Sequence, residues 1–197
     1  MSYVLDGWIP AGILKNKFVH FKQLRSVEIL NASLMTDFSL WEVLGTLPFL
    51  KNFTMEVDDP ESLPGHAPEN SNRQSGGLRY FDALESLHVT GPFFLIQHLL
   101  GFIDSPCLKS IEVSPYHNDL ERGHEAEDVL TPSLTIVASK WSQSLKELTI
   151  GSHKICITHR NSKFLTPLAD LHEIQNFDLV GWRMKKNNDA LRRLAEA

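Results

Sequence analysis

The residues best suited by type to hold a metal ion lie in the last third of the chain. Cys156 and His159 are three residues apart, and His153 precedes Cys156 by three more. A structural zinc ion takes four ligands, usually as two close pairs, and no second Cys or Cys-His pair accompanies this one. His117 and His124 lie in a separate polar stretch. The spacing therefore predicts no metal site.

The sequence also lacks the short motifs that organise common catalytic sites. It contains no G-x-S-x-G elbow, no P-loop, no G-x-G-x-x-G turn and no H-E-x-x-H pair. His124-Glu125 and His172-Glu173 lack the second histidine, and Gly76-Gly77 is not followed by the lysine of a phosphate cradle. We therefore expect no catalytic residues and no cofactor, in a protein that is not an enzyme.

The net charge of the chain limits the kind of partner that it is expected to bind. The 197 residues include 19 Lys and Arg against 24 Asp and Glu, a formal net charge of −5. This sign is wrong for a protein whose affinity comes from neutralising phosphates. We expect no nucleic-acid partner.

No segment of the sequence is typical of a membrane span or a secretion signal. The most apolar stretch, from Pro92 to Ile103, is shorter than the roughly 20 residues that cross a bilayer. Met1 to Leu14 has no early basic residues. Cys107 and Cys156 are too few for a disulfide framework and are expected to be small buried hydrophobes. We expect no membrane partner and a cytoplasmic or nuclear location.

One recurring pattern determines the expected fold. An aliphatic first residue is followed at +3 and +5 by two further apolar residues, the L-x-x-L-x-L core of a leucine-rich repeat. Residues two apart in an extended strand point to the same face, so each copy predicts a strand with one buried side. Parallel stacking of these strands would bury that side in a shared core. The six copies are Leu24/Val27/Ile29, Leu50/Phe53/Met55, Leu84/Leu87/Val89, Leu108/Ile111/Val113, Leu145/Leu148/Ile150 and Ile174/Phe177/Leu179.

The spacing of the copies indicates a single irregular repeat domain over residues 1–197. Their first residues are about 30 positions apart on average, slightly more than is typical of this architecture. Two polar stretches, 58–77 and 114–128, account for the excess and are predicted to be flexible loop insertions.

The segments between the strands mostly predict helices. Thr90 with Pro92 and Thr131 with Pro132 are typical helix starts, and Asp37 is expected to cap a further helix. Shorter helical segments are expected at 164–171, where Pro167 limits the length, and at 189–196. The predicted apolar faces are Phe93, Ile96, Leu99, Leu100 and Ile103; Leu134, Val137, Ala138 and Trp141; and Leu40, Trp41, Val43, Leu44 and Leu47.

Alternation within the strands distinguishes two α/β architectures. The central strands of a doubly wound sheet are buried on both faces and are nearly continuous apolar runs. Here polar residues alternate with apolar ones, as in Ser86-Leu87-His88-Val89 and Glu147-Leu148-Thr149-Ile150. The expected fold is therefore α/β, a leucine-rich-repeat solenoid with a parallel sheet on the concave face and helices on the convex face.

The polar residues of the strands define the expected binding surface, because partners of a solenoid usually dock on its concave sheet. Five of these residues are acidic and none is Lys or Arg, which favours a basic segment of a protein partner. The alternative is that the face is polar for solubility alone. The candidate binding residues are Glu28, Thr54, Glu56, His88, Glu112, Glu147, Thr149 and Asp178, with Thr90 and Ser114 on the same face.

From about Leu24 to Met184 the chain resembles a known family. The similarity is carried by the segments DFSLWEVLGTLPFLKNFTMEV, RYFDALESLHVTGPFFLIQHLLGFIDSPCLKSIEVS, TPSLTIVASKWSQSLKELTIGS and LADLHEIQNFDLVGWRM. They resemble the repeat region of F-box proteins of basidiomycete fungi. In that family an N-terminal F-box binds a Skp-type adaptor of a cullin ubiquitin ligase, and the repeats hold the substrate. The resemblance implies substrate recognition for ubiquitin ligation.

The chain departs from that family before the first predicted strand. Met1 to Phe21 is too short for an F-box helical bundle, and neither Leu47-Pro48 nor Leu63-Pro64 is followed by an acidic residue. We find no F-box and therefore do not expect this chain to bind a Skp-type adaptor. Two other interpretations stay open: a hydrolase or transferase on an α/β scaffold, and a non-functional fragment of a larger repeat protein.

Overall fold

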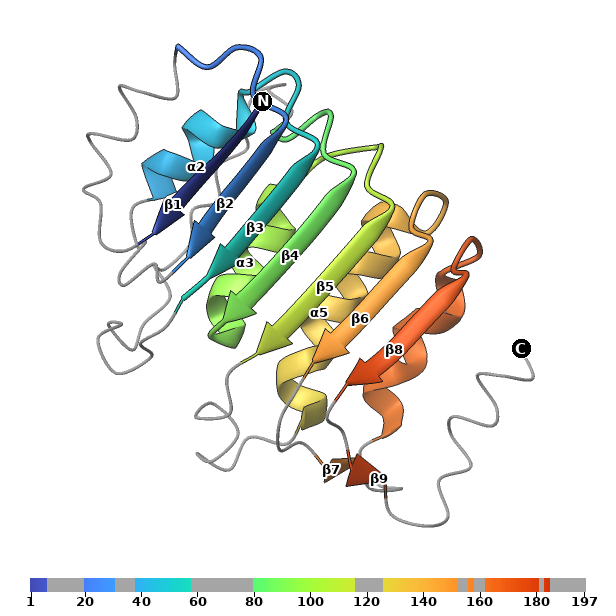
Figure 1. Cartoon of the computed structure of the whole chain (residues 1–197). Helices are drawn as coiled ribbons and strands as arrows, with labels where there is room; N and C mark the ends of the chain where they lie inside the picture. The colour runs from blue at the N-terminus through green and yellow to red at the C-terminus, as the bar shows by residue number, and fades with distance from the viewer. Residues whose placement is uncertain are drawn as a thin grey trace.

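Seven strands form one all-parallel sheet in the order β1-β2-β3-β4-β5-β6-β8 (Figure 1). The structure is a computed structural model that describes residues 1–6, 20–30, 38–57, 80–115, 126–151, 156–157, 162–180 and 183–184. Strand order follows sequence order, so each strand lies beside its predecessor. The strands are β1 (Ser2–Asp6), β2 (Ser26–Leu30), β3 (Asn52–Glu56), β4 (Ser86–Gly91), β5 (Ser110–Pro115), β6 (Glu147–Gly151) and β8 (Asn176–Val180).

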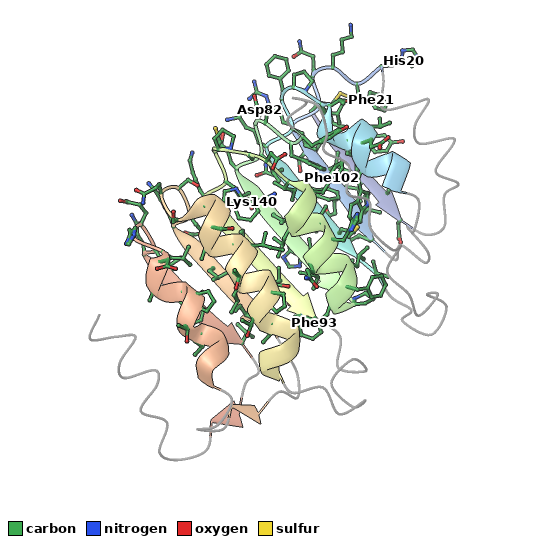
Figure 2. The ribbon with its side chains drawn as sticks, turned by 180° about the vertical axis from the view of Figure 1, so that it is seen from behind. His20, Phe21, Asp82, Phe93, Phe102 and Lys140 are labelled. Carbon is green, nitrogen blue, oxygen red and sulfur yellow. The ribbon has the colours of Figure 1, made fainter. Side chains whose placement is uncertain are left out.

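The helices of the described residues all lie on one face of this sheet, as the opposite views in Figures 1 and 2 show. They are α2 (Phe38–Gly45), α3 (Phe93–Phe102), α5 (Ala126–Trp141) and the 3-10 helix η1 (Ser162–Asp170). A separate two-stranded parallel sheet joins β7 (Cys156–Ile157) to β9 (Arg183–Met184). The fold is therefore α/β, as predicted, and no helix of the described residues covers the second face of the large sheet.

The register of the sheet aligns the repeated pattern from strand to strand and confirms all six predicted strands. The +3 residues are paired in sequence order, from Val27 with Phe53 to Leu148 with Phe177. Leu87, Ile111 and Leu148 are neighbours in one row, and each is at most 1% exposed. The +5 residues form a second buried row, which consists of Ile29, Met55, Val89, Val113 and Ile150.

A seventh strand, β1, was not predicted from the sequence. Tyr3 pairs with Val27 and Leu5 with Ile29, so these two residues occupy the +3 and +5 positions. The first position of the pattern would then fall one residue before Met1, which is why a search for the full motif misses this strand.

A repeated pair of backbone hydrogen bonds at the entrance to each strand fixes the register. The carbonyl oxygen of Arg25, at +1 of its copy, accepts hydrogen bonds from the N–H groups of Lys51 (2.8 Å) and Asn52 (3.0 Å). The carbonyl of Lys51 accepts from Glu85 (2.7 Å) and Ser86 (2.9 Å) in the same way. Each +1 carbonyl thus receives the +1 and +2 N–H groups of the next copy. The same pair of hydrogen bonds recurs at Glu85, Lys109 and Lys146.

The described side chains of the predicted helix faces are buried or half-buried, but two predicted helix starts are wrong. Thr90 belongs to β4, and α3 begins at Phe93 with the extended Pro92 at its N-cap and no side-chain cap. Helix α5 begins at Ala126, so Thr131 and Pro132 lie inside it. Proline at this point removes one backbone donor. Burial of Leu130 and Leu134, on either side of Pro132, anchors the helix there.

The boundaries of the second predicted insertion also change. Strand β5 continues to Pro115 and α5 begins at Ala126, so the insertion expected at 114–128 includes residues of both elements. The helical segment expected at 164–171 corresponds to the 3-10 helix η1, which ends at Asp170, contains Pro167 and buries Leu165 and Leu168. The expected insertion at 58–77, the cap Asp37 and the final segment at 189–196 lie outside the described residues.

Candidate binding surface on the outer face of the sheet

The face of the large sheet opposite the helices, here called the outer face, carries the residues at +2, +4 and +6 of each copy. Six of the eight predicted binding residues share the +4 row of paired residues. They are Glu28, Thr54, His88, Glu112, Thr149 and Asp178. Glu147 lies in the +2 row beside Asn176, and Glu56 lies in the +6 row beside Thr90. The register therefore brings residues up to 150 positions apart in sequence onto one face.

The middle of the +4 row contains a direct contact between neighbouring strands. The Nδ1 atom of His88 lies 3.0 Å from a carboxylate oxygen of Glu112, and both side chains are partly exposed. At the β6–β8 junction, the amide of Asn176 donates to the Glu147 carboxylate across 3.5 Å. These contacts orient two of the predicted acidic residues while leaving them accessible from the outer face.

A row of mostly basic residues borders the outer face at the strand entrances, and the sequence analysis did not identify it. We call it the entrance row; it contains the +1 residue of each copy. Its members are Arg25, Lys51, Glu85, Lys109, Lys146 and Gln175. Alternation counted from the buried residues includes only +2, +4 and +6, so the +1 position was left out. The signal was nevertheless present, because Arg or Lys directly follows the first residue in four of the six copies.

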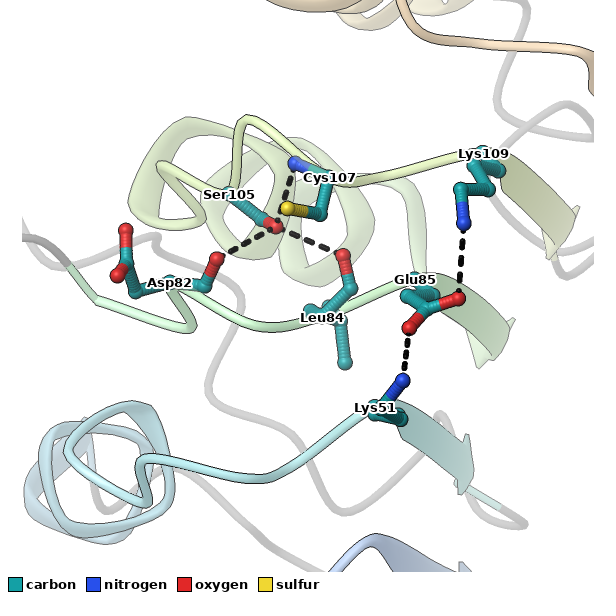
Figure 3. Close-up of polar contacts among 7 residues, drawn as sticks. All are labelled: Lys51, Asp82, Leu84, Glu85, Ser105, Cys107 and Lys109. Atoms are coloured by element: carbon teal, nitrogen blue, oxygen red, sulfur yellow. Dashed lines mark hydrogen bonds and ion pairs between the residues drawn. The ribbon is translucent and has the colours of Figure 1, made fainter.

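The only acidic member of the entrance row links its two lysine neighbours (Figure 3). Glu85 forms ion pairs with Lys51, on the preceding strand side, and with Lys109 at 3.0 Å on the following side. The hydrogen bonds from Lys51 and then Lys109 lower the pKa of Glu85 from 4.5 to about 2. The carboxylate thus stays charged over the physiological range and holds the two lysines in line.

The outer face therefore has opposite charges at its two ends. The entrance row has four basic residues and one acidic residue among six positions. The rows farther along the strands, from +2 to +6, contain Glu28, Glu56, Glu112, Glu147 and Asp178 without a Lys or Arg in these six copies. Residues at +1 and +4 are about 10 Å apart along an extended strand. The face can therefore attract cationic groups at its acidic rows and anionic groups at its entrance.

Buried polar contacts beneath the entrance row connect it to the helix layer. The Ser105 hydroxyl donates to the carbonyl oxygens of Leu84 (2.7 Å) and Asp82 (3.3 Å) and accepts the N–H of Cys107 (3.2 Å) (Figure 3). Ser105 is 1% exposed. It therefore ties the chain segment entering β4 to the segment entering β5, just before their +1 residues Glu85 and Lys109.

The structure corrects one expectation about reactive groups. Cys107 is an exposed free thiol rather than a buried hydrophobe, because it lies in the turn that precedes the buried Leu108. The side chains of Cys156, His153 and His159 lie outside the described residues. Within the described parts of the chain, no three His, Cys, Asp or Glu residues are grouped so that they could hold a metal ion.

The described helices contain no segment that is both long and apolar enough to span a membrane. No protein-family model matches the chain, and neither the curated proteins nor the solved structures include a match to it.

Proposed function

We propose that the chain is an irregular leucine-rich-repeat solenoid that binds a protein partner on the outer face of its sheet and carries out no catalysis. The proposal rests on the alignment of six copies of one motif, which places six polar +4 residues in a single row. A repeat architecture uses such a row as one extended docking surface. The helices occupy the other face, so an approaching partner meets the outer face unobstructed by any described helix (Figure 1).

Charge favours a partner that offers a basic segment. The acidic residues of the outer face lie in neighbouring rows, and Glu112 is held by His88 at 3.0 Å. A segment containing Lys or Arg would gain long-range attraction as well as direct contacts there. Such attraction weakens with salt, because exposed charges are screened over about 10 Å at ordinary ionic strength.

The resemblance to fungal F-box proteins supports a more specific role, the recognition of a substrate for ubiquitin ligation. In this proposal the outer face holds the substrate. The chain itself does not bind the Skp-type adaptor, since it shows no F-box motif. Co-expression of the full chain with a Skp-type adaptor should therefore give no stable complex. A stable complex of this chain with the adaptor would contradict this part of the proposal.

A matched pair of charge reversals tests the docking surface. Glu112→Lys changes the +4 row, whereas Asp170→Lys makes the same charge change at the exposed end of η1 in the helix layer. We expect an Arg-rich peptide labelled with a fluorophore to bind Glu112→Lys roughly tenfold more weakly than wild type, with Asp170→Lys nearly unchanged. Equal weakening by both variants would mean that net charge, and not the outer face, governs binding.

A further inference from the structure

The sheet ends at β8 with an apolar edge that differs from every internal junction. In the five copies of the pattern that contain β2 to β6, the first, +3 and +5 residues are at most 6% exposed. The corresponding residues of the last copy, Ile174, Phe177 and Leu179, are only half-buried. Among the described residues no strand pairs with the second edge of β8. Within the described part of the chain, the last copy therefore has no neighbouring strand like the one that covers the equivalent residues of the other copies.

The backbone at this edge can form the same pair of entrance hydrogen bonds that joins the other strands. Gln175 and Asn176 donate their N–H groups to the carbonyl of Lys146, at 2.8 Å and 3.0 Å. By the rule seen at each earlier junction, the carbonyl of Gln175 would accept the +1 and +2 N–H groups of a further strand. β8 carries one charged residue, Asp178, and no Lys or Pro of the kind that protects sheet edges from pairing.

At the other end of the sheet, β1 offers the complementary edge. Met1 occupies the +1 position, since its carbonyl accepts the Arg25 N–H at 3.0 Å. Tyr3 and Leu5 occupy the +3 and +5 positions. Four large apolar side chains are strongly exposed in the described residues, and three of them belong to these two ends: Met1 at 63%, Val4 at 58% and Val180 at 55%. Among the described strands, β1 and β8 are thus the two strands of the large sheet that pair on one side alone, and exposed apolar side chains lie at both ends.

We propose that a second copy of the chain covers this edge, with its β1 pairing in parallel with β8 and continuing the sheet from one molecule to the next. Continuing the internal register would pair Tyr3 with Phe177 and Leu5 with Leu179 on the core side. On the outer face Val4 would lie opposite Asp178 and diagonal to Val180. The contact is heterologous, because it joins two different edges, so it generates open head-to-tail chains rather than a closed dimer.

Val4 and Asp178 give a test that is specific to this register. Within one molecule they lie on the two outermost of seven strands, about 29 Å apart at the usual strand spacing. They would be cross-strand neighbours only between molecules. Val4→Lys should therefore strengthen association, and Val4→Asp should weaken it, each by about fivefold at most. The double variant Val4→Asp/Asp178→Lys restores opposite charges and should associate at least as well as wild type.

The experiment is sedimentation velocity of the full chain, from low micromolar to near-millimolar concentration, with circular dichroism to confirm folding. We expect the average mass of the wild type to rise past that of a dimer without reaching a plateau. Phe49→Asp is the control, since Phe49 is 51% exposed but lies in the turn between α2 and β3. It should leave association unchanged. A wild type that stays monomeric or stops at a dimer overturns the proposal. The proposal is also overturned if Val4→Lys and Val4→Asp shift association in the same direction.

Discussion

The indole Nε1–H of Trp141 donates a 2.8 Å hydrogen bond to the backbone carbonyl of Ser105. Both residues are buried at 1% exposure. Trp141 is the last residue of α5, and Ser105 joins the end of α3 to the entrance of β5. This one contact therefore connects the end of α5 with the segment that leads from α3 to the entrance of β5. Trp141 therefore contributes a buried hydrogen bond as well as apolar volume to the core.

We expect Trp141→Phe to lower the free energy of unfolding by about 2 to 4 kcal/mol. The substitution removes the donor to a buried carbonyl and leaves part of the indole volume empty. Urea denaturation measures the loss. Ser139→Ala, at an exposed position of the same helix, is the control and should change stability by less than about 0.5 kcal/mol. A loss below about 1 kcal/mol for Trp141→Phe would show that the hydrogen bond contributes little.

Lys140 closes the C-terminal end of α3 from the neighbouring helix (Figure 2). Its Nζ donates to the carbonyls of Gly101 (2.6 Å), Ile103 (2.8 Å) and Leu100 (3.3 Å), and lies 3.1 Å from the Asp104 carboxylate. A cation at this end also interacts favourably with the helix dipole. We expect Lys140→Met, which keeps the apolar stem, to cost about 1 to 2 kcal/mol.

The companion variant separates carbonyl capping from the ion pair. Asp104→Asn should cost less than about 0.5 kcal/mol, because the pair is partly exposed and the carbonyl contacts remain. Thermal or urea unfolding of the two variants gives the comparison. If Asp104→Asn were as damaging as Lys140→Met, the ion pair rather than the cap would be the main contribution.

The Glu85 carboxylate makes stability depend on pH in the acid range. Its pKa is lowered from 4.5 to about 2 in the folded chain by Lys51 and Lys109. A depressed carboxyl pKa contributes stability above pH 4.5 that is lost as pH falls toward 2. We expect Glu85→Gln to reduce this acid-dependent loss, and the difference from wild type to shrink at high salt because the pairs are on the surface.

Unfolding by urea at a series of pH values measures the effect. Glu147→Gln is the matched control, since its carboxylate contacts the neutral amide of Asn176 at 3.5 Å. Comparison with this variant separates the loss of the two lysine ion pairs at Glu85 from the loss of a carboxylate in general. Parallel curves for Glu85→Gln and wild type would contradict a lowered pKa at Glu85.

Two glycines should respond to alanine in opposite directions. A Cβ on Gly45, at the end of α2, would lie 2.9 Å from Cδ1 and 3.0 Å from Cβ of Tyr80. Tyr80 is itself stacked on Phe102 with ring centroids 4.4 Å apart, so it has little room to shift. Gly45→Ala should therefore destabilise the chain by about 1 to 3 kcal/mol.

Gly101, within α3, has no atom within 4 Å of the added Cβ. Alanine there should stabilise the helix by up to about 1 kcal/mol, since it lowers the entropy lost on folding. Differential scanning calorimetry of both variants compares them directly. Stabilisation by alanine at position 45 would contradict the close packing of Gly45 on Tyr80, and destabilisation by alanine at position 101 would contradict the space around Gly101.

The strands could be predicted from sequence because their pattern has a direct physical cause. Val27 and Ile29 must be buried together, so their spacing of two identifies an extended segment with one covered face. The seventh strand had only Tyr3 and Leu5 to identify it, without a first residue. The beginning of α5 was misplaced because Thr131-Pro132 has the chemistry of a helix start, while burial of Leu130 before it depends on tertiary packing.

The outer face was predicted more completely than its border. Alternation located all eight candidate residues, because side-chain direction in a strand follows from sequence position alone. The entrance row lies where the chain enters the strand, so its inclusion depends on the hydrogen bonds of Arg25 and Lys51 to the next strand. The exposure of Cys107 likewise depends on the turn that Ser105 stabilises, which the sequence does not specify.

Binding on the outer face is the central claim, and nuclear magnetic resonance of the full chain tests it most directly. An Arg-rich peptide is titrated into labelled protein, and the amide shifts are followed for the two layers. We expect the largest shifts at His88, Glu112 and Thr149 in the +4 row, with little change at Gln97 and Ser139 on the exposed side of the helices. Shifts concentrated on the helices, with the +4 row unmoved at saturating peptide, would contradict it.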